Sequence, residues 1–179
     1  MKVNKHWGML AFAWATLAAA TTSAQDAYKW GDIDCAQSRI VPLSNGKCRA
    51  TNVVSGGDTA GGQFQRWSVQ SSTPYTHVSL HESLIPNSYI RTTQTGPEYL
   101  KSANQRAKSA SSISEAKRYS DADFYLFRAN DEECVGFRRY GPSRSVGYAW
   151  IMAGVTCAPK GTPLAQARIA EFIDSARLK

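Results

Sequence analysis

Residues 124–157 read FYLFRANDEECVGFRRYGPSRSVGYAWIMAGVTC, the densest concentration of aromatic and β-branched residues in the chain. Two groups of turn-forming residues divide this stretch, first Asn130-Asp131 and then Gly141-Pro142-Ser143. Such residues separate extended segments because they favour turn conformations or lack a backbone donor. The stretch therefore predicts three consecutive antiparallel strands, and the rest of the chain is organised around the sheet that they form.

The beginning of the chain has the pattern of a secretory signal peptide. Lys2 and Lys5 make a positive start, an uncharged and mostly apolar run follows at 7–20, and small residues follow at 22–24. This run is shorter than the roughly 20 residues that a membrane-spanning helix needs. We therefore expect a cleaved signal peptide at 1–24, a periplasmic or secreted location, and no stable membrane insertion after cleavage. A retained membrane anchor is the alternative.

All four cysteines follow this segment, and an even number in an exported chain predicts two disulfides. Of the three possible pairings we favour the sequential one, Cys35 with Cys48 and Cys134 with Cys157. The first pair flanks a turn-rich segment, and the second flanks the predicted hairpin. The register leaves the second bridge open: a tight turn would place Cys134 opposite Met152, so the bridge needs a wider loop, a bulge or another partner.

Two strands and two helices complete the predicted elements. Polar and apolar residues alternate at 63–70 and 76–80, which predicts strands, and a glycine–proline pair at 96–97 begins a helix. The C-terminal helix is expected to be capped by Thr162 and to start at Pro163, with apolar residues at helical spacing. We expect its apolar face to pack on the third strand, on the face that carries Ala149, Ile151, Ala153 and Val155.

These elements predict one α+β domain at 25–179. Its antiparallel sheet should have about five strands, with the C-terminal helix packed on one face and two disulfides stapling the fold. Residues 25–62 are expected to form a disulfide-clipped N-terminal lobe that ends in a glycine-rich loop.

Charge and motif content restrict the function without identifying it. The chain has 21 Lys and Arg against 14 Asp and Glu, a mildly basic balance that could favour an anionic partner. No dense basic cluster with interleaved aromatic residues occurs in a nucleic-acid-binding motif, so a nucleic acid partner is not expected. The oligomeric state is left open, and no cofactor is expected.

Catalytic residues are not identifiable. The chain has no Gly-x-Ser-x-Gly pentapeptide, and Asp131, Glu132 and Glu133 are adjacent in a predicted turn rather than convergent. His77 and His81 lie on a predicted strand, where they share a face but are about 13 Å apart, too far to share a metal. They are weak metal candidates, and we expect neither a metal site nor a catalytic site in the chain.

Arginine and aromatic residues on the neighbouring strands are the strongest binding candidates. Arginine forks bind carboxylates and phosphates, and tyrosine and tryptophan provide rigid contact area. The candidate residues are Arg128, Arg138, Arg139, Tyr140, Arg144, Tyr148 and Trp150. Alternatively, these arginines only rim the sheet and cover its aromatics with their stems. Alternation places Arg139 on the face of Val135 and Phe137, where a partly buried arginine must have a partner.

Two strings near the C-terminus, ECVGFRRYG at 133–141 and CAPKGTPL at 157–164, precede the closing helix. Together they resemble small exported proteins of unassigned function found in alphaproteobacteria, over about the last third of the chain. The resemblance implies a periplasmic or secreted bacterial protein and brings no catalytic residue with it. The expected function is a non-enzymatic binding domain of the bacterial cell envelope that recognises a protein or an anionic envelope component. The alternative is a periplasmic cell-envelope hydrolase with an unrecognised site.

Overall fold

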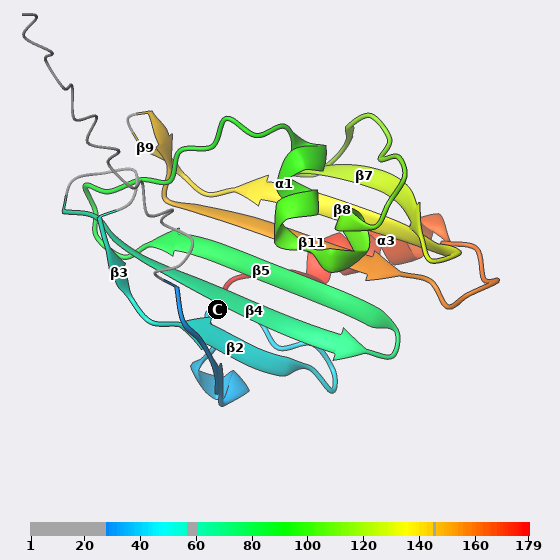
Figure 1. Ribbon diagram of the computed structural model, residues 1–179, viewed down its shortest axis with the longest axis horizontal. Coiled ribbons are helices and arrows are strands. Elements are labelled where there is room, and N and C mark those ends of the chain that lie inside the picture. Colours follow the sequence, from blue (N-terminus) through cyan, green and yellow to red (C-terminus); the bar gives the residue numbers. More distant parts are fainter. Residues whose placement is uncertain (1–27, 57–60, 145) are drawn as a thin grey trace, which may run out of the picture.

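The computed structural model describes residues 28–56, 61–144 and 146–179, so the predicted signal peptide at 1–24 lies outside the described residues. The described chain forms a nine-stranded antiparallel sheet in the order β1-β2-β4-β5-β11-β8-β7-β6, with β3 also paired to β4 (Figure 1). Its strands are β1 (Trp30–Ile33), β2 (Lys47–Thr51), β3 (Val54–Ser55), β4 (Gln63–Ser72), β5 (Tyr75–Ser83), β6 (Lys117–Tyr119), β7 (Ala122–Ala129), β8 (Glu132–Tyr140) and β11 (Trp150–Cys157). A separate hairpin joins β9 (Ser143–Arg144) to β10 (Gly147–Tyr148).

The predicted α+β fold with about five strands is wrong. The described residues are mostly sheet, and the three α-helices are short: α1 (Gly96–Ala103), α2 (Gln105–Lys108) and α3 (Gln166–Ser175). A 3₁₀ turn, η2 (Cys35–Gln37), precedes β2. The segment 25–62, expected to form a disulfide-clipped N-terminal lobe, contributes β1, β2 and β3 to this sheet, and β6 forms its opposite edge.

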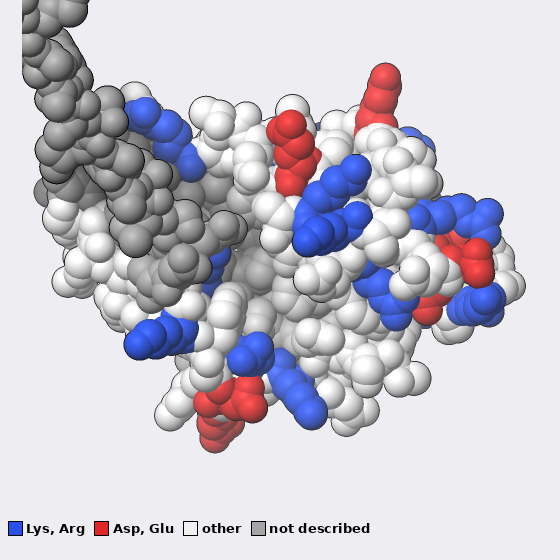
Figure 2. All heavy atoms as spheres, viewed as in Figure 1, with Lys and Arg blue, Asp and Glu red and all other residues white. Residues whose placement is uncertain are grey.

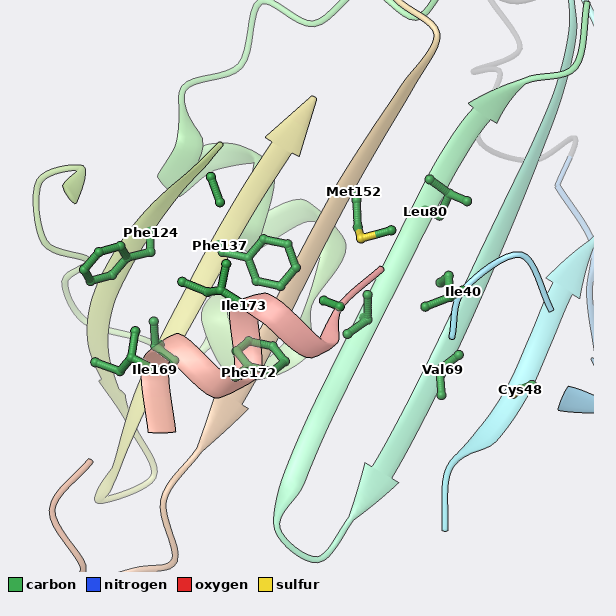
Figure 3. Packing of buried hydrophobic residues seen from close by; sticks show 14 residues of the cluster. Ile40, Cys48, Val69, Leu80, Phe124, Phe137, Met152, Ile169, Phe172 and Ile173 are labelled. Carbon is green, nitrogen blue, oxygen red and sulfur yellow. The ribbon is translucent and has the colours of Figure 1, made fainter. Parts of the chain in front are cut away.

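Helix α3 packs on the face of β11 opposite to the predicted one (Figure 3). Phe172 and Ile173 lie in one apolar cluster with Met152 and Phe137, whereas Ala153 belongs to the cluster on the other side. Gly154 explains this choice, because a Cβ there would lie 3.0 Å from Phe172 and 2.5 Å from Phe137. The bare backbone at this position lets the Phe172 ring approach the strand.

The start of α3 also differs from the prediction. The helix begins at Gln166, three residues after Pro163, and its N-cap residue Ala165 makes no side-chain cap hydrogen bond. Thr162 lies outside the helix, in a turn in which its backbone N–H donates to the carbonyl of Pro159.

Both predicted disulfides are confirmed, Cys35–Cys48 and Cys134–Cys157. Cys134 and Cys157 are directly paired positions of β8 and β11, and Met152 lies opposite Arg139 instead. The wider loop that this pairing requires is present, because the chain between β8 and β11 leaves the sheet to form the β9–β10 hairpin.

The sheet is covered unevenly on its other face. Helix α1 contacts β7, β8 and β11, and α2 contacts β7, so these helices lie over one half of the sheet (Figure 1). The strands β2, β4 and β5 have no covering helix on this side among the described residues. The side chains of β4 match this layering: Trp67 and Val69 point to the α3 side, and Ser68 and Gln70 point to the uncovered side.

Candidate functional site

The uncovered half of the sheet forms the floor of a groove of about 780 Å³ beside α1. The space-filling view shows this face, with a hollow near its centre and basic side chains along part of its border (Figure 2). The groove is lined by Trp30 and Asp32 of β1; Asn45; Lys47 and Arg49 of β2; Arg66, Ser68, Gln70 and Ser72 of β4; His77, Ser79, Leu80 and His81 of β5; Gln94; Tyr99, Ser102 and Ala103 of α1; and Gln105 of α2. We call it the polar groove, since most of these side chains carry hydrogen-bonding groups.

Strand register arranges the floor of the polar groove in rows. Ser68 pairs with Ser79, and Gln70 pairs with His77. On the other side of β4, in β2, Arg49 pairs with Ser68 and Lys47 pairs with Gln70. Each row therefore crosses three strands. Alternate residues of a strand are about 7 Å apart, so basic side chains recur at about that interval from Arg66 through Arg49 to Lys47.

The basic side chains outnumber the acidic ones in the polar groove. Asp32 is the one carboxylate among the described lining residues, and it pairs with Arg49 at 3.0 Å. Arg66 forms no ion pair with a described residue, its guanidinium lies 4.2 Å from the centre of the Tyr28 ring, and its Nε is buried without a hydrogen-bond partner. A partly buried cation without a counter-charge favours an incoming anion.

The two histidines of the floor are neutral at physiological pH. Burial lowers the pKa of His77 to about 4, and burial together with the Arg66 charge lowers the pKa of His81 to about 3. The Nδ1 of His77 lies 3.2 Å from the side-chain nitrogen of Asn104, and the Nε2 of His81 lies 3.1 Å from the Tyr28 hydroxyl. They therefore act as hydrogen-bonding groups rather than as charges.

The structure does not bring His77 and His81 together as metal ligands. They lie four residues apart on β5, which separates them by about 13 Å. Within the described parts of the chain, the one group with metal-ligand spacing is Glu132, Cys134 and Cys157. Its two sulfurs are joined in a disulfide and are not free to ligate.

Three of the predicted binding residues meet on the α1 side of the sheet. The Arg138 guanidinium lies 5.0 Å from the centre of the Tyr140 ring, and the Tyr140 and Tyr148 rings stack at 4.2 Å. Arg138 is only 8% exposed, and its Nη1 donates to the Gln94 carbonyl at 2.9 Å. This contact holds the segment that leads into α1, next to the polar groove.

The other four predicted residues lie elsewhere. Arg139 and Trp150 face the α3 side, as does the exposed Arg128 at the end of β7. Arg144 donates to the carbonyls of Ile85 and Ser88 and so fastens the loop after β5. The seven residues therefore do not form one face.

The expectation that Arg139 needs a partner is confirmed. Its guanidinium donates to the carbonyls of Ala176 at 2.7 Å and Ile173 at 3.3 Å, and it pairs with Asp121 at 2.8 Å. These contacts satisfy carbonyls at the C-terminal end of α3, where a helix leaves acceptors unpaired and favours a cation.

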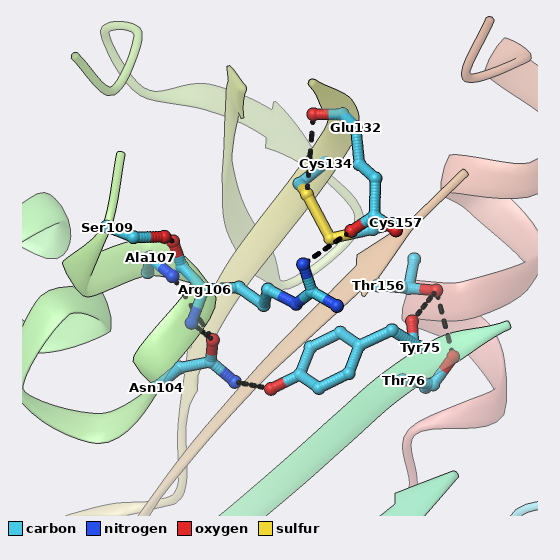
Figure 4. Close-up of a disulfide and its surroundings, with 10 residues drawn as sticks. All are labelled: Tyr75, Thr76, Asn104, Arg106, Ala107, Ser109, Glu132, Cys134, Thr156 and Cys157. Atoms are coloured by element: carbon cyan, nitrogen blue, oxygen red, sulfur yellow. Dashed lines mark hydrogen bonds and ion pairs between the residues drawn. A yellow bond between two sulfur atoms is a disulfide. The ribbon is translucent and has the colours of Figure 1, made fainter. Parts of the chain in front are cut away.

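One end of the polar groove is fastened next to the buried Cys134–Cys157 disulfide (Figure 4). Arg106 of α2 pairs with Glu132 at 2.9 Å and lies over the Tyr75 ring at 5.0 Å. The Asn104 amide donates to the Tyr75 hydroxyl at 2.9 Å, while its oxygen accepts from the first N–H groups of α2. These contacts hold the α1–α2 junction against the start of β5.

Sequence reasoning missed the residues of the polar groove other than the two histidines. A signal was present, because Arg66, Ser68, Gln70 and Ser72 alternate with Trp67 and Val69 along β4. Such alternation shows that one strand face is polar. It does not show that a helix beside this face turns it into a groove.

No helix among the described residues is long and apolar enough to cross a membrane. No protein-family model, curated protein or solved structure matches the chain.

Proposed function

We propose that this protein is an exported, non-enzymatic binding domain of the bacterial cell envelope, and that it holds an extended anionic ligand in the polar groove. The observation that carries the proposal is the charge of this groove. Among the described lining residues, Lys47, Arg49 and Arg66 stand against one carboxylate, that of Asp32, and the Nε of Arg66 has no hydrogen-bond partner. Clefts lined mostly by one sign of charge raise the local concentration of oppositely charged ligands.

The groups in the groove support binding rather than hydrolysis. A general base works best with a pKa near the operating pH, whereas the pKa values of His77 and His81 are about 4 and about 3. The Ser79 hydroxyl donates to the backbone carbonyl of Ala153 at 3.4 Å, so no neighbouring base activates it in this arrangement. The Asp32 carboxylate is held by Arg49.

Two observations support the exported location. The chain begins with the pattern of a cleaved signal peptide, and its four cysteines form two disulfides. Disulfides persist in oxidising compartments such as the periplasm and the extracellular space. The resemblance to small exported alphaproteobacterial proteins agrees with this location.

A titration followed by amide NMR tests the proposal. Isotope-labelled, oxidised protein is titrated with dextran sulfate oligomers as a general polyanion, and with neutral dextran as the control. We expect shifts on groove residues such as Ser68, Gln70 and Ser79, their loss at high salt, and none with dextran. Shifts confined to the far edge, around Arg118 and Arg128, would place anion binding outside the polar groove and contradict the proposal.

A further inference from the structure

We propose that the ligand of the polar groove is an acidic polysaccharide whose sugar units carry carboxylates, a polyuronate chain lying along β4. This inference rests on the proposed function and specifies the ligand class. Three features of the groove carry it: an arginine that forms no ion pair with a described residue and whose Nε has no hydrogen-bond partner, a floor of neutral hydrogen-bonding groups, and aromatic rings on the walls.

Arg66 supplies the guanidinium group that would bind a carboxylate. It extends from β4, an interior strand of the sheet, and stacks on Tyr28. A guanidinium matches the two oxygens of a carboxylate, and its planar shape makes such pairs geometrically specific. Because Nε is buried and unpartnered, a carboxylate that reaches it would satisfy a donor that the protein leaves open.

The floor between the basic residues suits hydroxyl groups. Ser68, Gln70 and Ser79 both donate and accept hydrogen bonds, and so does a neutral imidazole such as that of His77. Sugar hydroxyls are also both donors and acceptors. A bare chain of sulfates or phosphates would offer acceptors only and leave the acceptors of the floor unmatched.

The aromatic rings stand on the walls. Trp30 is 39% exposed at the β1 wall, and Tyr99 lies on the α1 wall. Trp30 can therefore cover the apolar face of a sugar ring, whereas Tyr99 is partly buried against the apolar clusters under α1. Single-stranded nucleic acid is instead bound by rows of aromatic side chains on which successive bases stack. Among the described groove-lining residues of β4 and β5, the only ring side chains are the two histidines, about 13 Å apart.

The row of cations suits a chain that carries several charges along its length. Arg66, Arg49 and Lys47 occupy successive rows of the floor, about 7 Å apart. From Arg66 to Ser72 the floor extends for about 20 Å along β4. A single sugar acid would contact one row, whereas a chain of several units would contact all three.

Isothermal titration calorimetry with three probes tests the inference. The probes are a galacturonic acid oligomer, its fully methyl-esterified form, which keeps the chain and removes the charge, and an oligothymidylate. We expect the acid oligomer to bind most tightly. Equal affinity for the methyl ester would overturn the carboxylate assignment.

Matched variants locate the binding. Arg66→Gln should weaken binding of the acid oligomer by about tenfold, because a charge-assisted hydrogen-bond pair is lost. Lys47→Gln, at an exposed position, should weaken it roughly twofold to fivefold. Lys117→Gln makes the same charge change on β6 at the far edge and should leave affinity unchanged. Equal effects of Lys47→Gln and Lys117→Gln, in protein with unaltered circular dichroism, would overturn the placement.

The outcomes separate this inference from the proposed function. If dextran sulfate shifts the groove residues but the galacturonic acid oligomer does not bind, the ligand class is wrong and the anion-binding groove stands. Tighter binding of oligothymidylate that depends on Arg66 leads to the same conclusion. If neither dextran sulfate nor the galacturonic acid oligomer binds in the polar groove, both the proposed function and this inference are wrong.

Discussion

His77 and His81 should make the protein less stable as the pH falls from about 7 to about 5. Their ordinary pKa is 6.5, and in the folded chain it is lowered to about 4 for His77 and to about 3 for His81. Between these values the unfolded chain binds a proton on each imidazole that the folded chain does not bind. The free energy of unfolding therefore rises with pH through this window and decreases as the pH falls.

The size of the effect follows from the same shifts. One pKa unit corresponds to about 1.4 kcal/mol, so at about pH 5 each histidine removes about 2 kcal/mol and the two together about 4 kcal/mol. The exposed carboxylates of Glu98 and Asp131 also have lowered pKa values, through hydrogen bonds to Thr95 and to Lys160 respectively. Their ordinary values are 4.5 and 3.8, so the stability that they contribute is lost below this window.

Urea unfolding followed by tryptophan fluorescence measures the loss at both pH values. The matched variants are His77→Gln and His81→Gln, because glutamine keeps a hydrogen-bonding amide but does not titrate. We expect each single variant to lose about 2 kcal/mol less than the original chain on acidification, and the double variant to show almost no loss over this range. A double variant that loses as much stability as the original chain would refute the reasoning.

Two further predictions concern contacts that stabilise the fold. Arg139→Met removes the donors to the Ala176 and Ile173 carbonyls and should lower the free energy of unfolding by about 3 kcal/mol. Arg128→Met, at an exposed site on the same face, should change it by less than about 0.5 kcal/mol in the same urea assay, and equal losses would contradict the capping role. Replacing Cys134 and Cys157 together by alanine should cost about 3 kcal/mol by loop entropy, measured by urea unfolding under non-reducing conditions. An unchanged unfolding midpoint would contradict the contribution of this bridge.

The central strands could be predicted from the sequence, whereas the short edge strands and the pairing of the strands could not. The run 124–157 predicted β7, β8 and β11 because two groups of turn residues divide it into segments rich in aromatic and β-branched residues. β1 and β6 were missed because they are edge strands of four and three residues with mostly exposed side chains, so no apolar pattern marks them. Their pairing is decided by the neighbouring strands and not by their own propensity.

The candidate site shows the same limit. Arg138 and Arg139 are adjacent in sequence, so alternation sends their side chains to opposite faces, and they could not share a binding surface. Alternation did identify Arg139 as a buried arginine that needs partners. It could not show that Arg66 would form no ion pair with a described residue, because that depends on which residues the register brings beside it.

The polar groove follows from the lengths of the covering segments. Eight strands side by side, about 4.8 Å apart, make a sheet that is roughly 34 Å wide, whereas an eight-residue helix such as α1 is about 12 Å long. α3 is scarcely longer, but on its side the segment around Ile40 bridges to Leu178 and completes the apolar cover over Val69 and Cys48. On the α1 side no described segment plays this part, and the strand positions that lie open there carry serine, glutamine, histidine and arginine. If another layer of the protein covered this half of the sheet, those positions would need apolar side chains, like the strand positions that face α3. The uncovered half is therefore specified as a polar surface by the same alternation that builds the core behind it.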